Sequence, residues 1–216
     1  MNKAICLTLD NNYKFTQKTL VGLSSAEGSK NWSLITRIDP QCPGILKLIR
    51  GFDGCFNKID VSINPIKYGY TINFLKNLGE VIQNPEAQVL ILNNRIKVSK
   101  DALYLAEWYF EHHEDDETNF ALSLCGGIKE NSPHILFRMK NLIPYCWATT
   151  SGVLKGFLET IETMEVNLND LLSSYIEKNS LTNLYPVSSR ALVFGEEYTE
   201  DSTFDCNSSF YGEFES

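Results

Sequence analysis

Residues 89–110, VLILNNRIKVSKDALYLAEWYF, contain in order a buried strand, a polar turn and a helix. The four apolar residues at 89–92 are typical of a strand that is buried on both faces of a sheet. Asn93, Asn94 and Arg95 follow at once, and an alternating Ile-Lys-Val then suits a short, half-buried strand. In open α/β sheets, ligands bind where such turns leave the carboxyl ends of the strands. The stretch therefore predicts an α/β fold with a binding site at this turn.

The helix after the turn is predicted from its first residues and from its apolar face. Ser99 is a favourable N-cap, and Asp101 stands in the first turn, where the helix dipole favours a negative charge. Four apolar or aromatic residues then fall on one helical face, namely Leu103, Ala106, Tyr109 and Phe110.

Predicted strands and helices alternate along the rest of the chain. Before residue 89, strands are expected at 4–9, 33–38 and 59–63. The helices that follow them are expected at 15–23 (with Thr16 as a cap), 45–49 and 71–82. After residue 110, a strand at 120–125 precedes a helix at about 153–163 and a helix that opens with the stretch 166–172 and runs to about 178. This alternation predicts a doubly wound, mainly parallel sheet flanked by helices.

The length and composition are those of one globular domain. The chain has 216 residues, of which 43% are hydrophobic and 21% charged, and this length allows a substantial core. No apolar run approaches the roughly 20 residues that span a bilayer, and the N-terminus lacks the features of a signal peptide. The six cysteines form no C-x-x-C pair, which favours free thiols over a zinc or redox motif. We therefore expect a cytoplasmic protein without a membrane partner.

The negative charge is concentrated at the C-terminus. The net charge is −8, and residues 196–216 contain seven acidic residues and no Lys or Arg, which leaves −1 for the first 195 residues. We accordingly divide the chain into a domain at 1–195 and an acidic tail at 196–216. A nearly neutral domain gives little support for a broad nucleic-acid footprint, which needs clustered Lys and Arg. A local basic groove stays open.

The stretch at 89–110 also resembles the central segment of the GT-A fold glycosyltransferases, particularly the N-acetylglucosaminyltransferase I type. In that family, a buried strand ends in an acidic triplet that holds a divalent metal, and a connection reading x-V-S-x-D leads into a helix. This chain matches the strand, the connection at 97–101 and the helix. It has Asn93, Asn94 and Arg95 where the family has acids, so its metal-binding motif is degenerate.

The resemblance extends over the first hundred residues and implies a nucleotide-sugar site. The family has a polar loop after the first strand, and an acid after the second strand that contacts the nucleotide. Before its next helix it has N-P-x-x-x-G-x-x-x-N, which Asn64, Pro65, Gly69 and Asn73 match. The resemblance implies that the donor is bound by Asp10, Asn11, Asp39, Asn73, Asn93, Asn94 and Arg95.

Three residues of the second half also align with family segments. Trp147 lies where the family lines its acceptor side, so it is predicted to stack on a sugar, although a core position explains a tryptophan equally well. Asp170 aligns with the acid that acts as general base, although Asn169 replaces the usual Trp before it; a helix dipole also explains an Asp in a first turn. Arg190 belongs to a P-x-x-S-R-x-x-x-x-G match at 186–195, and we add it to the donor site.

Charge arguments predict that the reaction needs no metal. A glycosyl transfer must stabilise a diphosphate leaving group and deprotonate an acceptor hydroxyl. Asn93 and Asn94 are neutral and poor ligands for a hard divalent cation. Arg95 stays charged and binds phosphate oxygens bidentately, so we expect it, helped by Arg190 or Lys97, to replace the ion. No cofactor is then required, and Mn or Mg would need acids from elsewhere in the chain.

The predicted function is the transfer of a hexosyl or N-acetylhexosaminyl group from a nucleotide-diphosphate sugar to an acceptor hydroxyl of a saccharide or protein. The resemblance implies a UDP-sugar and inversion at the transferred carbon. A catalytically inactive relative, which binds sugars or serves as a scaffold, explains the lost acids as well. Transfer to modified bases of viral DNA and an unrelated α/β protein are two further hypotheses.

Overall fold

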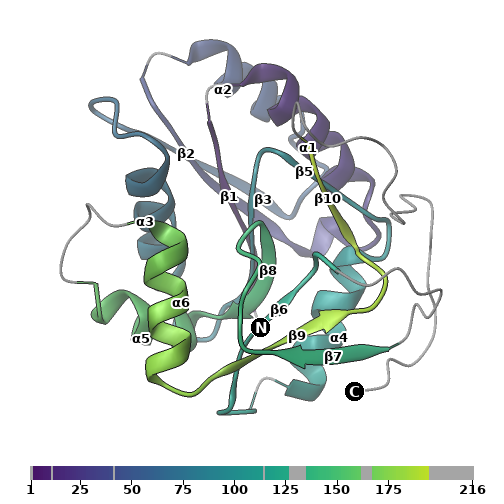
Figure 1. Cartoon of the computed structure of the whole chain (residues 1–216). Helices are drawn as coiled ribbons and strands as arrows, with labels where there is room; N and C mark the ends of the chain where they lie inside the picture. The colour runs from purple at the N-terminus through teal and green to yellow at the C-terminus, as the bar shows by residue number, and fades with distance from the viewer. Residues whose placement is uncertain are drawn as a thin grey trace.

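One eight-stranded sheet forms the centre of the structure (Figure 1). The computed structural model describes residues 2–10, 12–40, 42–113, 115–126, 135–161 and 167–194, in which the strand order is β3-β2-β1-β4-β8-β6-β9-β7. These strands are β1 (Lys3–Thr8), β2 (Ser33–Ile38), β3 (Lys58–Ile63), β4 (Gln88–Asn93), β6 (Asn119–Ser123), β7 (Leu136–Met139), β8 (Cys146–Thr150) and β9 (Thr182–Pro186).

The first half of the sheet is parallel and the second half is mixed. β3, β2, β1 and β4 run in one direction, β8 is antiparallel to β4 and β6, and β9 is parallel to β6. The four strands predicted up to residue 92 make up the parallel half. The predicted fold class, a mainly parallel α/β sheet flanked by helices in one domain, is confirmed.

Helices cover both faces of the sheet. They are α1 (Tyr13–Ser25), α2 (Pro43–Arg50), α3 (Tyr70–Val81), α4 (Ala102–His113), α5 (Ser151–Glu159) and α6 (Leu168–Lys178), with a short 3-10 turn at Ser29–Asn31. Buried residues of α1, α2 and α4 pack on one face, and those of α3, α5 and α6 on the other. Of the helices in the described residues, none has the length and apolar character of a membrane span.

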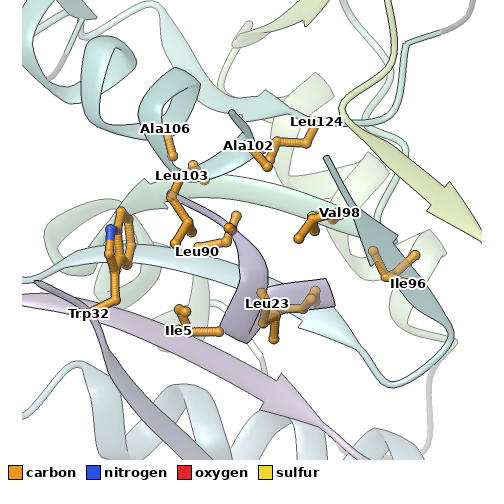
Figure 2. Close-up of a cluster of buried hydrophobic side chains, with 14 of the residues drawn as sticks. Ile5, Leu23, Trp32, Leu90, Ile96, Val98, Ala102, Leu103, Ala106 and Leu124 are labelled. Atoms are coloured by element: carbon orange, nitrogen blue, oxygen red, sulfur yellow. The ribbon is translucent and has the colours of Figure 1, made fainter. Parts of the chain in front are cut away.

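The apolar stretch at 89–92 lies at the centre of the core. Leu90 of β4 and Ile5 of β1 meet Leu23 of α1, Leu103 of α4 and the ring of Trp32 on one face (Figure 2). Because successive strand residues point to opposite faces, the next residues of β1 and β4 pack under α3, α5 and α6. A strand covered on both faces has to be apolar at every position, which explains the unbroken run at 89–92.

Two helix starts differ from the prediction. The cap of α1 is Asn12 rather than Thr16, because the Asn12 side chain accepts a hydrogen bond from the Phe15 amide at 3.1 Å. Helix α4 begins at Ala102, and Asp101 just before it is fully buried. Its carboxylate forms an ion pair with Arg190 at 2.7 Å, so its charge serves this pair rather than the helix dipole.

A small second sheet ties the C-terminal residues to the central stretch. β5 (Ile96–Val98) pairs antiparallel with β10 (Ala191–Val193). Beside it the chain passes close to Gly126, where an added Cβ would lie 2.6 Å from the Pro186 carbonyl oxygen. The Gly126 amide donates a hydrogen bond to Ser189 Oγ at 3.0 Å. The segment predicted from the terminal motif therefore packs against the loop after β6.

Candidate functional site

The carboxyl ends of β2, β1 and β4 lie side by side at one edge of the sheet. Thr8 of β1 is in register with both Arg37 of β2 and Asn93 of β4. The pairing continues past the strands, because the backbone N–H of Asn94 donates to the Thr8 carbonyl at 3.0 Å. The residues predicted to bind the donor from positions 10, 39 and 93–95 therefore follow three neighbouring strands at one edge. Asn11 lies outside the described residues.

Asp39 lies at this edge, and hydrogen-bond donors surround its carboxylate. Its carboxylate oxygen Oδ1 accepts from Asn64 Nδ2 at 2.8 Å, from the Tyr68 amide at 3.2 Å and from Asn73 Nδ2 at 3.4 Å. The side chain is 5% exposed. Desolvation by burial opposes ionisation, but the bonds from Asn64, Tyr68 and Asn73, together with one from the Gly69 amide, lower the pKa of Asp39 below its usual value. The site therefore contains a carboxylate that is held charged.

The local sequence explains how the two asparagines reach Asp39. Gly69 has a φ of +81°, which is unfavourable for other residues, and the turn it forms leads directly into α3. Asn73 lies one helical turn further on, where its backbone N–H donates to the Gly69 carbonyl at 3.1 Å. Asn64 Nδ2 also donates to Asn73 Oδ1 at 2.6 Å. The N-P-x-x-x-G-x-x-x-N match thus describes a turn and a helix start that are built around Asp39.

Asp10 and Asn94 join the loop after β1 to the turn after β4. Asn94 Nδ2 donates to Asp10 Oδ1 at 2.7 Å and to Thr16 Oγ1 at 2.8 Å, while its Oδ1 accepts from the Asp10 amide at 3.1 Å. Asn94 is 1% exposed, so its side chain supports the loop from inside. Asn93 instead accepts the Arg95 amide at 2.8 Å, which tightens the turn.

The guanidinium of Arg95 lies at the surface of the same edge. Its Nε donates to Asp10 Oδ2 at 3.0 Å, and its central carbon stands 5.0 Å from the ring centre of Phe15. The side chain is 47% exposed, and within the described residues its Nη1 and Nη2 atoms have no hydrogen-bond partner. An exposed pair of this kind contributes about 1 kcal/mol or less. Arg95 is thus held in place by one nitrogen, on a side chain that is about half exposed.

Two tyrosines at this edge were not predicted from the sequence. Tyr70 opens α3, and Tyr145 precedes β8, whose first residue pairs with Leu92 at the end of β4. The Tyr70 hydroxyl turns inwards, where desolvation, opposed by a hydrogen bond with Asn93, raises its pKa to about 12 although the residue as a whole is 38% exposed. The Tyr70 phenol therefore remains protonated near neutral pH. Nothing in the local sequence separates the two residues from ordinary surface tyrosines.

Asp170 lies in the first turn of α6 and is exposed. Helix α6 leads into β9, which runs parallel to β6 and in the same direction as β4. The start of the helix is therefore directed towards the carboxyl ends of the strands, as Figure 1 shows. Within the described residues, the Asp170 side chain forms no hydrogen bond. The structure thus leaves its carboxylate accessible on the same side of the sheet as Asp39 and Arg95.

Trp147 does not line the site. Its side chain is fully buried in the core under α5 and α6, where its ring stacks on Phe120 with the ring centres 5.5 Å apart. It belongs to β8, and its register partner Ile91 is equally buried. The prediction that Trp147 stacks on an acceptor sugar is wrong, because no sugar reaches a side chain on the covered face of a central strand.

Arg190 also differs from its predicted role. It is 1% exposed, and its guanidinium donates to Asp101 Oδ2 at 2.7 Å and to the Ser188 carbonyl at 2.5 Å. Its charge is compensated inside the protein, between α4 and the small β5–β10 sheet. A phosphate group at the surface therefore does not contact this guanidinium. The prediction that Arg190 belongs to the donor site is corrected, because the residue lies in the core.

The side chains at the edge do not fit a divalent cation. Asp10 is the acid nearest to the turn at 93–95, and its two oxygens are occupied by Arg95 and Asn94. Arg95 adds a positive charge that repels a cation. In the part of the chain that the structure describes, no group of three or more His, Cys, Asp and Glu side chains is close enough to hold a metal ion. Metal independence stays a prediction.

The fold is similar to those of solved glycosyltransferases. TarS of S. aureus, residues 1–349 in complex with UDP-GlcNAc, has a TM-score of 0.69 at 15% identity, covering 92% of this chain and 60% of that one. The mannosyltransferase PcManGT of Pyrobaculum calidifontis, in complex with GDP-Man and Mn2+, has a TM-score of 0.60 at 12% identity, covering 86% and 54%. By sequence, the chain matches no known family and no curated protein.

Both structural neighbours are GT-A glycosyltransferases, and the chain has a GT-A-like fold. It spans 60% of the solved TarS fragment and 54% of PcManGT. At identities this low, the likeness defines the fold, and any activity has to be argued from this chain's own residues.

Proposed function

We propose that this protein transfers a sugar from a nucleotide-diphosphate sugar, with a UDP-sugar as donor, to an acceptor hydroxyl. The observation that carries the proposal is the buried, ionised Asp39 after β2, which is separated by the single strand β1 from β4 and the surface guanidinium of Arg95 that follows it. One group is suited to a nucleobase and the other to a diphosphate. Their common edge is where ligands bind in open α/β sheets, and the fold is shared with enzymes solved in complex with such donors.

Asp39 suits a base that presents an N–H group. A carboxylate accepts hydrogen bonds and donates none, and Oδ1 of Asp39 is already occupied by Asn64, Tyr68 and Asn73. The carboxylate still has free lone pairs, and these can accept a hydrogen bond from the imino N–H of uracil. Cytosine carries a lone pair at the same ring position and is repelled there. This chemistry supports UDP over CDP as the nucleotide of the donor.

Arg95 suits the diphosphate. A guanidinium binds phosphate oxygens with two parallel N–H donors, and Nη1 and Nη2 of Arg95 are the nitrogens that Asp10 leaves unused. The exposed Tyr145 adds a hydroxyl donor at the same edge. Together they offset the leaving-group charge without the acids that other GT-A enzymes use to hold a metal.

Asp170 is the proposed general base. A base must remain ionised and must be reachable by the acceptor hydroxyl, and Asp170 is exposed at the positive end of α6. The acceptor is proposed to be a saccharide or protein hydroxyl, because the nearly neutral domain does not favour DNA.

Binding without transfer is the second candidate function. The contacts of Asn94 favour this function. The resemblance aligns Asn94 with an acid of the metal-binding triplet, but its side chain donates hydrogen bonds to Asp10 and Thr16. A protein of this kind would bind the nucleotide or a sugar and release no product. Calorimetric titration with UDP, together with an assay for UDP release from UDP-sugars, separates the two functions.

Replacing Asp39 by Asn should weaken UDP binding by about 1.5–3 kcal/mol, the scale of a hydrogen bond to a charged group. The preference for UDP over CDP should fall with it, because an amide can donate to cytosine. Asp60→Asn is the matched control, since Asp60 is an exposed acid of β3 paired with Lys58. Calorimetry with both nucleotides measures the effect, and an unchanged UDP affinity in Asp39→Asn would remove Asp39 from the site.

Replacing Arg95 by Ala should weaken UDP binding by about 1.5–3 kcal/mol, because charged hydrogen bonds to the diphosphate are lost. Uridine, which has no phosphate, should bind both proteins equally. Lys155→Ala serves as the control, since Lys155 is an exposed cation on α5. Wild-type binding should persist in a chelator. Binding that requires manganese would contradict the proposed role of Arg95.

A further inference from the structure

Arg37 contacts Asn64, which is one of the hydrogen-bond donors around Asp39. It belongs to β2, two residues before Asp39, and its side chain is 16% exposed. Its Nη1 donates to Asn64 Oδ1 at 3.0 Å, and its Nη2 forms an ion pair with Glu80 of α3. Glu80 also accepts from Ser62 Oγ at 2.8 Å. A chain of polar contacts thus runs from Glu80 through Arg37 and Asn64 to Asp39.

The contacts of Asn64 allow one orientation of its amide. The oxygen faces Arg37, which can only donate, and the nitrogen faces the Asp39 carboxylate, which can only accept. A rotated amide would place its N–H groups against the guanidinium and its oxygen against the carboxylate, so both contacts would become repulsive. The two Nδ2 hydrogens are also both used, one on Asp39 and one on Asn73 Oδ1 at 2.6 Å.

We propose that Arg37 is a positioning residue for nucleotide recognition, which acts by holding the Asn64 amide in the orientation that orders Asp39. This inference rests on the proposed function and adds a residue that touches no ligand. Without Arg37, Asn64 Oδ1 loses its donor and the amide is held through Nδ2 alone, so the shortest hydrogen bond of the carboxylate and the direction of its free lone pairs are fixed less tightly. Selectivity for the base depends on that direction, so Arg37 sets selectivity as well as affinity.

Glu80 explains why a cation is tolerated at this depth. A buried guanidinium is costly without a partner, and the ion pair with Glu80 compensates its charge. Arg37 can then present Nη1 to Asn64 as a strong donor without drawing the Asp39 carboxylate towards itself. The side-chain amide of Asn64 lies between the Arg37 guanidinium and the Asp39 carboxylate. It separates the two charges, and its contact with Arg37 fixes the direction in which it donates to Asp39.

The test compares Arg37→Met, Arg37→Lys and Arg50→Met with the wild type. Methionine keeps much of the side-chain volume and removes every donor, whereas lysine can still donate to Asn64. Arg50 is an exposed arginine of α2 paired with Asp53 at 3.8 Å, and it lies outside the polar chain. The double variant Arg37→Met with Glu80→Gln leaves no unpaired acid, so it keeps the test valid if the single variant unfolds.

We expect Arg37→Met to lower UDP affinity about tenfold, the effect of losing roughly one hydrogen bond, and to reduce the ratio of UDP to CDP affinity. Arg37→Lys should restore most of both, and Arg50→Met should change neither. A variant that only loosened the fold would weaken UDP and CDP equally, and this result would contradict the positioning role.

Side-chain amide NMR separates this inference from the proposed function, because it needs no nucleotide. In the wild type, both Asn64 amide hydrogens should exchange slowly with water, and in Arg37→Met they should exchange faster. Unchanged Asn64 exchange in a folded Arg37→Met protein overturns the positioning role by itself. A wild-type protein that binds neither UDP nor UDP-sugars overturns the proposed function, and with it the role of Arg37 in recognition.

Discussion

Replacing Asp170 by Asn should lower the rate of UDP release from a UDP-sugar by about 10²–10⁴-fold, the usual contribution of a general base. Asparagine has the size of the carboxylate but cannot take a proton from the acceptor hydroxyl. Because the base acts on the acceptor and not on the diphosphate, UDP should bind the variant as tightly as it binds the wild type. The measurement is a coupled assay of UDP release, with water as acceptor and with added saccharides.

Glu177→Gln is the matched control for this experiment, because Glu177 is an exposed acid at the other end of α6. Loss of the favourable interaction of Asp170 with the helix dipole should cost about 0.3–1 kcal/mol of folding stability, which does not remove the folded protein. If Asp170→Asn released UDP at the wild-type rate, Asp170 would not be the general base, and its interaction with the helix dipole would explain why an acid stands in the first turn of α6. A wild-type protein that binds UDP but never releases it from a UDP-sugar would favour binding without transfer.

Replacing Arg190 by Met should destabilise the protein by about 3–5 kcal/mol, the cost of leaving one partner of a buried ion pair alone. The Asp101 carboxylate would remain in the core, where both side chains of the pair are 1% exposed. Urea unfolding followed by circular dichroism measures the loss. The loss should be smaller in the double variant with Asp101→Asn than the sum of the two single losses, because the two residues interact directly.

Arg138→Met provides a closely matched control for Arg190. Its guanidinium pairs with Asp116 at the same 2.7 Å, but the two side chains are 42% and 23% exposed. Water screens this pair, so the expected loss is about 1 kcal/mol or less. Equal losses in the two variants would mean that the charge of Arg190 is not committed to the core, and its predicted place in the donor site would then have to be reconsidered.

Several features of the fold were predictable because they depend on local patterns. Apolar runs, alternation and helical spacing are set by the geometry of each element, and the strands at 4–9, 33–38, 59–63 and 89–92 were found close to their predicted ends. Helix caps were predicted less well. Both Asn12 and Thr16 are suitable caps for α1, and the choice depends on where the loop from β1 enters the helix.

The candidate site was predictable in part for a topological reason. Parallel strands bring their carboxyl ends to one edge, so residues after β1, β2 and β4 had to converge once the strands were known. Tyr145 could not be found in this way, because it reaches the edge only through β8, which runs antiparallel. Arg37 precedes the end of its strand, and its link to Asp39 passes through Asn64, 27 residues further on.

By itself, the sequence determined the type of the elements in the parallel half of the sheet, because these follow from periodicity over a few residues, whereas β7, β8 and β9 were not predicted. It also determined that the turn after β4 carries two amides and a guanidinium. Only the tertiary structure decided which side chains serve the core and which remain at the surface. Arg95 and Arg190 are the same residue type in similarly polar turns, yet one faces solvent and the other lies buried against Asp101, 89 residues away. Trp147 is in the core for the same reason, because burial depends on which elements pack over a strand, and that is set by contacts distant in the chain.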